Sequence, residues 1–170
     1  MSEPQGSTST GSSKSPLDAE AAGSSSSAVL AGEAPTTGAG PWTVKYLRPG
    51  PNWRPTPVVD ITITGPGEPL STMAVVDSGA DSSALPMSLA ADLGIDIESE
   101  CSSEVGMSSG GDTEHRIYRP GLRAEVFGHR FKIDATFTST PLILLGQEDF
   151  FMHFYVAFDR PAKEFTLRLH

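Results

Sequence analysis

The chain has 170 residues with 12 basic and 21 acidic side chains, so its formal net charge at pH 7 is -9 and its isoelectric point is about 4.8. Nucleic acids and anionic membranes bind basic surfaces, and this acidity argues against either as the main partner. A single cysteine, Cys101, excludes an internal disulfide framework and a cysteine-rich zinc site. No stretch approaches the roughly 18 apolar residues of a membrane span, and the first residues lack the basic and then apolar pattern of a signal peptide. We therefore expect a cytoplasmic protein.

Residues 1–40 differ in composition from the rest of the chain. Ser, Ala, Gly, Thr and Pro make up 30 of these 40 residues, and no aromatic residue occurs among them. Such a segment cannot bury enough apolar surface to offset the entropy lost on ordering it. We expect a disordered tail over 1–40 and one domain over 41–170.

From residue 41 onward, apolar and polar side chains mostly alternate. The alternation is clearest over 59–64, 131–137 and 165–169, and each run predicts a strand with one buried face. Short Gly- and Pro-containing turn signals separate these runs. The pattern predicts a mainly β domain, a small barrel or sandwich.

Two segments are read as helical, one short helix and a further turn or two. In Pro86–Gly94, Pro stands at a first helical position, Gly lies just past the end, and Leu89, Ala90 and Leu93 form an apolar stripe. Residues 147–153 follow a glycine and predict a helical turn or two. Trp42 and Trp53 are expected to anchor the start of the domain.

The most informative run is the apolar strand 73–76, which ends abruptly in Asp77-Ser78-Gly79. A carboxylate directly after buried-type residues is unfavourable unless it has a partner, several hydrogen bonds or a shared proton. Ser78 supplies a hydroxyl, and Gly79 permits a tight turn that brings backbone amides near the carboxylate. Taken alone, the same letters describe an ordinary turn that closes a hairpin.

A second apolar run, 141–145, ends in Gly146 and a helical start. With Val75-Val76-Asp77-Ser78-Gly79-Ala80-Asp81, Leu144-Leu145-Gly146 and a glycine-rich segment between them, the sequence resembles the retropepsin-like aspartic proteases, and bacterial members in particular. The resemblance covers about residues 55–158. It implies a closed β-barrel of the acid-protease fold with one short helix.

The resemblance also implies an activity, aspartic endopeptidase, and a site. Because the chain has one Asp-Ser-Gly, the second carboxylate would come from another copy, in a homodimer with Asp77 on its two-fold axis. No cofactor or metal is implied, and the partner would be a polypeptide substrate. The implied catalytic residues are Asp77, Ser78 and Gly79, and Gly146 is structural. The implied substrate-binding residues are Ala80, Asp81, Leu142, Leu144 and the flap residues Gly106, Met107, Ser108, Ser109 and Gly110.

One departure concerns the position after Gly146. Many family members carry Arg there, paired with the acidic residue that corresponds to Asp81, whereas this chain has Gln147. The expected contact is then a neutral hydrogen bond to Asp81 at best. A non-catalytic peptide-binding or dimerisation module with the same fold is the leading alternative, since fold alone does not determine function.

Other readings remain open. Gly106-x-Ser108-x-Gly110 formally matches the nucleophile elbow of serine hydrolases, but no helical pattern follows it. An unrelated β-barrel that binds a small ligand is a third hypothesis. The four histidines have no metal-like spacing, Cys101 is read as an ordinary thiol, and the acidic group is read as a solvated strand face: Glu98, Glu100 and Glu104.

Overall fold

The computed structural model describes residues 40–108 and 111–170, so the predicted tail lies outside the described residues except for Gly40. The described part is mainly β, as the alternating pattern predicted. Its elements in chain order are β1 (Trp42–Lys45), β2 (Val58–Thr64), β3 (Leu70–Val76), β4 (Ala84–Pro86), η1 (Met87–Leu89), α1 (Ile97–Glu100), β5 (Ser102–Ser108), β6 (Gly111–Val126), β7 (His129–Thr138), β8 (Ile143–Leu145), η2 (Phe150–Met152), β9 (Phe154–Asp159) and β10 (Glu164–Leu169).

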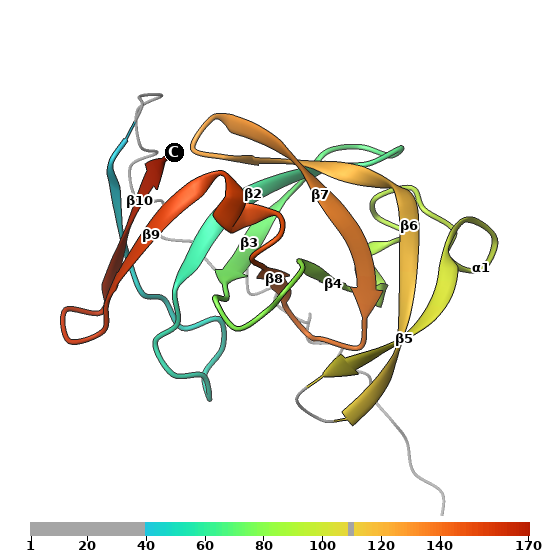
Figure 1. Cartoon of the computed structure of the whole chain (residues 1–170), viewed down its shortest axis with the longest axis horizontal. Coiled ribbons are helices and arrows are strands. Elements are labelled where there is room, and N and C mark those ends of the chain that lie inside the picture. Colours follow the sequence, from blue (N-terminus) through green and yellow to red (C-terminus); the bar gives the residue numbers. More distant parts are fainter. Residues whose placement is uncertain (1–39, 109–110) are drawn as a thin grey trace, which may run out of the picture. The chain divides into compact units, whose positions relative to one another are not determined.

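Six strands close into a barrel. Their order is β2-β3-β8-β4-β7-β6, and pairing of β2 with β6 completes the ring. Closure leaves none of the six with a free edge along the paired residues. Strand β5 pairs only with the first half of β6, and this β5–β6 hairpin extends away from the barrel (Figure 1).

The barrel interior is filled by alternate side chains of the strands. Ile63, Leu85, Ile133, Phe137 and Leu145 are all completely buried, and their neighbours in each strand face the other way. Full burial of one such side chain contributes about 1.5–3 kcal/mol relative to leaving it exposed. The apolar alternation read from the sequence therefore becomes a barrel with a packed interior.

A three-stranded sheet, in the order β1-β10-β9, lies on one side of the barrel (Figure 1). Its inner face joins the barrel core through aromatic rings: Trp42 stacks on Phe127 at 5.0 Å between centroids, and Phe150 stacks on Phe154 at 4.7 Å. Trp42 thus anchors the start of the domain as expected. The same expectation for Trp53 is wrong, because its side chain is 43% exposed.

The helical segments are shorter than the sequence predicts. Only Met87–Leu89 forms a 3₁₀ turn within the predicted helix 86–94, although Ala90 and Leu93 are buried as the apolar stripe indicated. The predicted end of this segment at Gly94 is confirmed, since Gly94 has φ +75°, a conformation that favours glycine. Residues 147–153 contain the single 3₁₀ turn η2.

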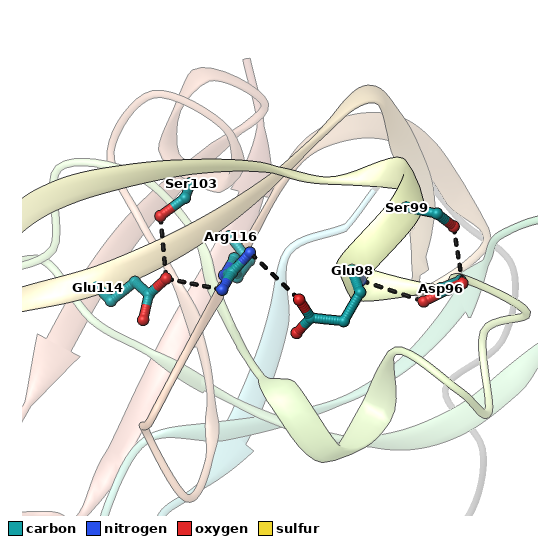
Figure 2. Close-up of polar contacts among 6 residues, drawn as sticks. All are labelled: Asp96, Glu98, Ser99, Ser103, Glu114 and Arg116. Atoms are coloured by element: carbon teal, nitrogen blue, oxygen red, sulfur yellow. Dashed lines mark hydrogen bonds and ion pairs between the residues drawn. The ribbon is translucent and has the colours of Figure 1, made fainter.

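The one α-helix within the described ranges, α1, lies where the sequence predicted a strand face. Glu98 and Glu100 belong to it, and only Glu104 lies on a strand, β5. Asp96 caps the helix: its carboxylate accepts hydrogen bonds from Ser99 Oγ at 2.7 Å and Glu98 N–H at 3.1 Å, and these bonds lower its pKa (Figure 2).

Arg116 links one face of the β5–β6 hairpin to α1. Its guanidinium lies 2.8 Å from the Glu114 carboxylate and 3.8 Å from that of Glu98, and Glu114 also accepts a hydrogen bond from Ser103 Oγ (Figure 2). These polar contacts connect both strands of the hairpin to the helix beside its base. These contacts therefore hold the base of the hairpin on the face that carries Arg116.

Candidate functional site

Asp77 follows the last residue of β3, at the point where the chain leaves the barrel. Its backbone N–H donates to Leu145 O at 3.1 Å, and its side-chain Oδ1 accepts the N–H of Gly79 at 2.9 Å. Ala80 N–H donates to Asp77 O at 3.2 Å and closes the turn. The carboxyl group is half-buried and held in one orientation, while Ser78 and Gly79 are exposed.

The turn that follows β8 is hydrogen-bonded to the Asp77 loop, which comprises residues 77–83 between β3 and β4. Gln147 N–H donates to Ala80 O at 2.9 Å, and Glu148 N–H donates to Asp81 O at 2.8 Å. A Cβ at Gly146 would lie 2.5 Å from the backbone carbon and oxygen of Ser82. Only glycine fits there, so Gly146 sets how closely the two turns approach.

Asp149 is a residue that the sequence analysis missed. It is buried, and its two oxygens accept the backbone N–H of Ser83 at 2.9 Å and of Asp134 at 3.0 Å. The hydroxyl of the fully buried Ser83 in turn accepts the N–H of Gly146 at 3.1 Å. These bonds join the Asp77 loop, β7 and the turn after β8.

The sequence carries only a misleading signal for Asp149. An Asp just before an aromatic helical start reads as a helix cap, and Asp149 does stand at the N-cap position of η2, but its side chain makes no capping bond there. Its carboxylate oxygens instead accept hydrogen bonds from backbone N–H groups that lie 66 and 15 residues away in the sequence.

Gln147 bonds to a different residue than expected. Its side-chain amide donates to the backbone oxygen of Ser78 at 2.9 Å rather than to the Asp81 carboxylate. The expectation of a neutral contact between Gln147 and Asp81 side chains is not what the structure has. The amide is instead hydrogen-bonded to the backbone of the Asp77 loop.

One continuous sheet face leads from Asp77 to the hairpin. Residues directly opposite each other in paired strands share a face, and residues two apart in one strand do as well. The pairings link Val75 with Leu144, Leu144 with Ala84, Ala84 with Thr136, and Thr136 with Ile117. Since Asp77 is two residues beyond Val75, it lies at one end of this face, which we call the outer wall: Val75, Leu144, Ala84, Thr136 and Ile117.

The remaining predicted binding residues are distributed as follows. Leu142 and Leu144 are half-buried, with Leu144 in the outer wall, and Asp81 is exposed within the Asp77 loop. Gly106, Met107 and Ser108 lie in β5, whereas Ser109 and Gly110 lie outside the described residues. Because β5 pairs directly with β6, Gly106 and Ser108 do not form the strand–turn–helix that a nucleophile elbow requires.

Two cavities are present elsewhere on the described chain. One, of about 340 Å³, lies at the β6 bulge between Pro66, Tyr118 and Lys132. The other, of about 540 Å³, lies between η1 and α1 and is lined by Met87 and Ile97 among others. None of the predicted site residues lines either cavity.

Three of the four histidines gather near the C-terminal end of the described chain. His129 Nε2 lies 3.5 Å from His153 Nδ1, and His170 Nε2 lies 3.2 Å from Phe151 O. Burial, and then the neighbouring His129, lowers the pKa of His153. Among residues 40–108 and 111–170, no group of three or more His, Cys, Asp or Glu side chains is arranged to hold a metal ion.

Cys101 is half-buried. Its burial, and then the nearby Glu100 carboxylate, raises the pKa of its thiol.

Comparison of the chain with protein-family models and with curated proteins finds no match. No helix in the described part of the chain is long and apolar enough to cross a membrane.

Proposed function

We propose that the protein is an aspartic endopeptidase with a retropepsin-like fold, in which two copies of Asp77 activate one water molecule. The observation that carries the proposal is the position of Asp77. Asp77 is half-buried, its carboxyl group is fixed by the Gly79 N–H, and it lies at the end of the outer wall, in which Leu144, Ala84 and Ile117 are half-buried. A peptide lying along that wall would pass over the carboxyl group.

The chemistry follows from pairing two carboxyl groups. Like charges that close cannot both ionise, so one group keeps a proton and the other stays a carboxylate. The carboxylate takes a proton from the water as its oxygen attacks the scissile carbonyl carbon. The protonated partner donates a hydrogen bond to the carbonyl oxygen, which becomes the oxyanion. Breakdown of the tetrahedral intermediate then returns a proton to the leaving amine, and no metal or cofactor takes part.

The pairing requires a homodimer, because the sequence holds a single Asp-Ser-Gly. An exposed Ser78 and Gly79 beside Asp77 suit an axis at which two loops meet. In this proposal Ser78 hydrogen-bonds across the axis and Gly79 leaves room for the substrate backbone. Asp81 contacts the substrate main chain, and Leu142 and Leu144 contact its side chains.

Support for this arrangement comes from the contacts that hold the Asp77 loop. Four groups of the turn after β8 bond to the loop or pack against it: Gly146, Gln147, Glu148 and Asp149. A general base needs a fixed position relative to its substrate, and a rigid loop of this kind provides one. An ordinary hairpin turn would need none of these long-range bonds.

The experiment is digestion of a peptide library by the full chain between pH 4 and 7, with and without a statine-type peptide inhibitor. Inhibitor-sensitive cleavage that Asp77→Asn abolishes, with an unchanged thermal melt, would support the proposal. Cleavage by Asp77→Asn at the wild-type rate would refute it. If neither protein cleaves a peptide and both bind one equally, the protein is a non-catalytic peptide-binding module instead.

A further inference from the structure

The outer wall continues onto the hairpin beyond Ile117. By alternation along β6, His115 lies on the same face as Ile117, and the register pairs Glu104 with His115 and Gly106 with Thr113. The opposite face of the hairpin carries Arg116, which bonds to α1 (Figure 2). The face with His115 is therefore the face that continues toward Asp77.

The imidazole of His115 covers Gly106. A Cβ built on Gly106 would lie 2.1 Å from His115 Cε1 and 2.3 Å from Nδ1, closer than any real contact. The ring therefore occupies the space in which a side chain at 106 would stand. On this face the hairpin presents an imidazole where the glycine-rich sequence indicated bare backbone.

His115 shares this face of the hairpin with other polar side chains that already have partners: Ser102 Oγ donates to Ile117 O at 3.5 Å, and Thr113 Oγ1 donates to Gly111 O at 3.3 Å. Ala84 is small, Ile117 is apolar, and Thr136 is 9% exposed. The charge of Arg119 is already paired with the Glu104 carboxylate. A neutral imidazole offers one N–H donor and one nitrogen acceptor.

We propose that His115 determines specificity by hydrogen-bonding a substrate side chain that carries a carboxamide or carboxylate oxygen. This inference rests on the proposed function, because it places a peptide on the outer wall. A peptide that covers the ring with an aliphatic side chain removes water from the imidazole N–H without replacing the bond. Gln, Asn, Glu or Asp replaces it. A buried donor left unpaired disfavours binding by roughly tenfold, so we expect a preference of that size at one substrate position.

The test starts from a peptide that the wild-type chain cleaves. Each position flanking the cleaved bond is changed in turn to Gln, Glu or Leu, and kcat/KM is measured. We expect one position at which Gln or Glu exceeds Leu by roughly tenfold. The Gln and Glu peptides distinguish a need for an oxygen acceptor from a need for negative charge.

Two variants assign the preference to His115. His115→Phe keeps a planar ring but loses both nitrogens, so the preference should disappear or reverse toward Leu. Gly106→Ala displaces the ring and should weaken the same preference, which keeps the test usable if His115→Phe does not fold. Val105→Ala is the matched control, since Val105 is 77% exposed on the opposite face and the preference should remain. An unchanged preference in both His115→Phe and Gly106→Ala overturns the inference.

Binding separates this inference from the proposed function. Calorimetric titration of the same Gln, Glu and Leu peptides into Asp77→Asn needs no catalysis. If the wild type never cleaves but binding depends on His115, the endopeptidase proposal fails and the specificity role stands. If cleavage occurs with no His115-dependent preference, the specificity role fails alone. Absence of both cleavage and binding overturns both.

Discussion

The buried carboxyl group of Asp149 should be one of the main supports of the Asp77 loop. Asp149→Ala removes the acceptors of two backbone N–H groups, one on the fully buried Ser83 and one on Asp134 in β7. A buried donor left unsatisfied costs about 1–3 kcal/mol. We expect the full cost at Ser83 and less at Asp134, where water can reach, for a total of about 2–5 kcal/mol.

That loss is a large share of the roughly 5–15 kcal/mol by which a domain is typically stable. For a domain of this size, it corresponds to a fall in melting temperature of roughly 6–20 °C. Asp149→Asn keeps one acceptor oxygen but directs an NH2 group at the other donor, so we expect an intermediate loss. Thermal melting by circular dichroism, with urea unfolding for the free energy, measures both variants.

Asp159→Ala is the matched control. Asp159 Oδ1 also accepts a backbone N–H, that of Ala162 at 2.9 Å, but in an exposed turn where water can replace the carboxylate. Its loss should cost less than about 1 kcal/mol. If Asp149→Ala costs no more than Asp159→Ala, the reasoning about Asp149 is wrong.

Three further predictions can be checked by unfolding measurements. Gly146→Ala should destabilise the domain by about 1–3 kcal/mol or more, because its Cβ would meet the Ser82 backbone at 2.5 Å; a neutral result in urea unfolding would contradict this packing. The lowered pKa of His153, caused by burial and then by His129, means that the folded state binds fewer protons than the unfolded state, so stability should fall as pH drops below about 6.5. The free energy of unfolding should change by at most about 1.4 kcal/mol per pH unit for one proton, and His153→Gln should reduce this slope. The same slope in His153→Gln would mean that another group causes the pH dependence. Removing residues 1–40 should leave the melting temperature within a few degrees, and a larger fall would show that these residues stabilise the domain.

Local pattern was enough to predict the strands with clear alternation but not the helical segments. Alternation over 59–64 and 131–137 has a direct cause, one buried and one exposed face, and β2 and β7 follow it. In 86–94 the apolar stripe correctly marked Ala90 and Leu93 as buried. The segment is too short to offset helix nucleation, so its backbone forms a 3₁₀ turn and isolated turns instead.

Two short motifs, Asp77-Ser78-Gly79 and Leu144-Leu145-Gly146, are the part of the candidate site that the sequence could indicate. Asp77 and Gly146 could be singled out from adjacent letters. Asp149 could not, since its donors lie 15 and 66 residues away and depend on how β4, β7 and β8 meet. The contact of His115 with Gly106 depends on the register of β5 against β6, which a sequence of glycines and serines does not specify.

Subunit mixing tests whether two Asp77 carboxyl groups from two chains form one site. Wild type is mixed with increasing fractions of Asp77→Asn at constant total protein, the dimers are allowed to exchange, and peptide cleavage is measured. If only wild-type pairs are active, activity follows the square of the wild-type fraction, so an equal mixture keeps about one quarter of the activity. If each chain holds a complete site, activity falls in proportion to the wild-type fraction, and an equal mixture keeps about half. A linear decline would contradict the paired site.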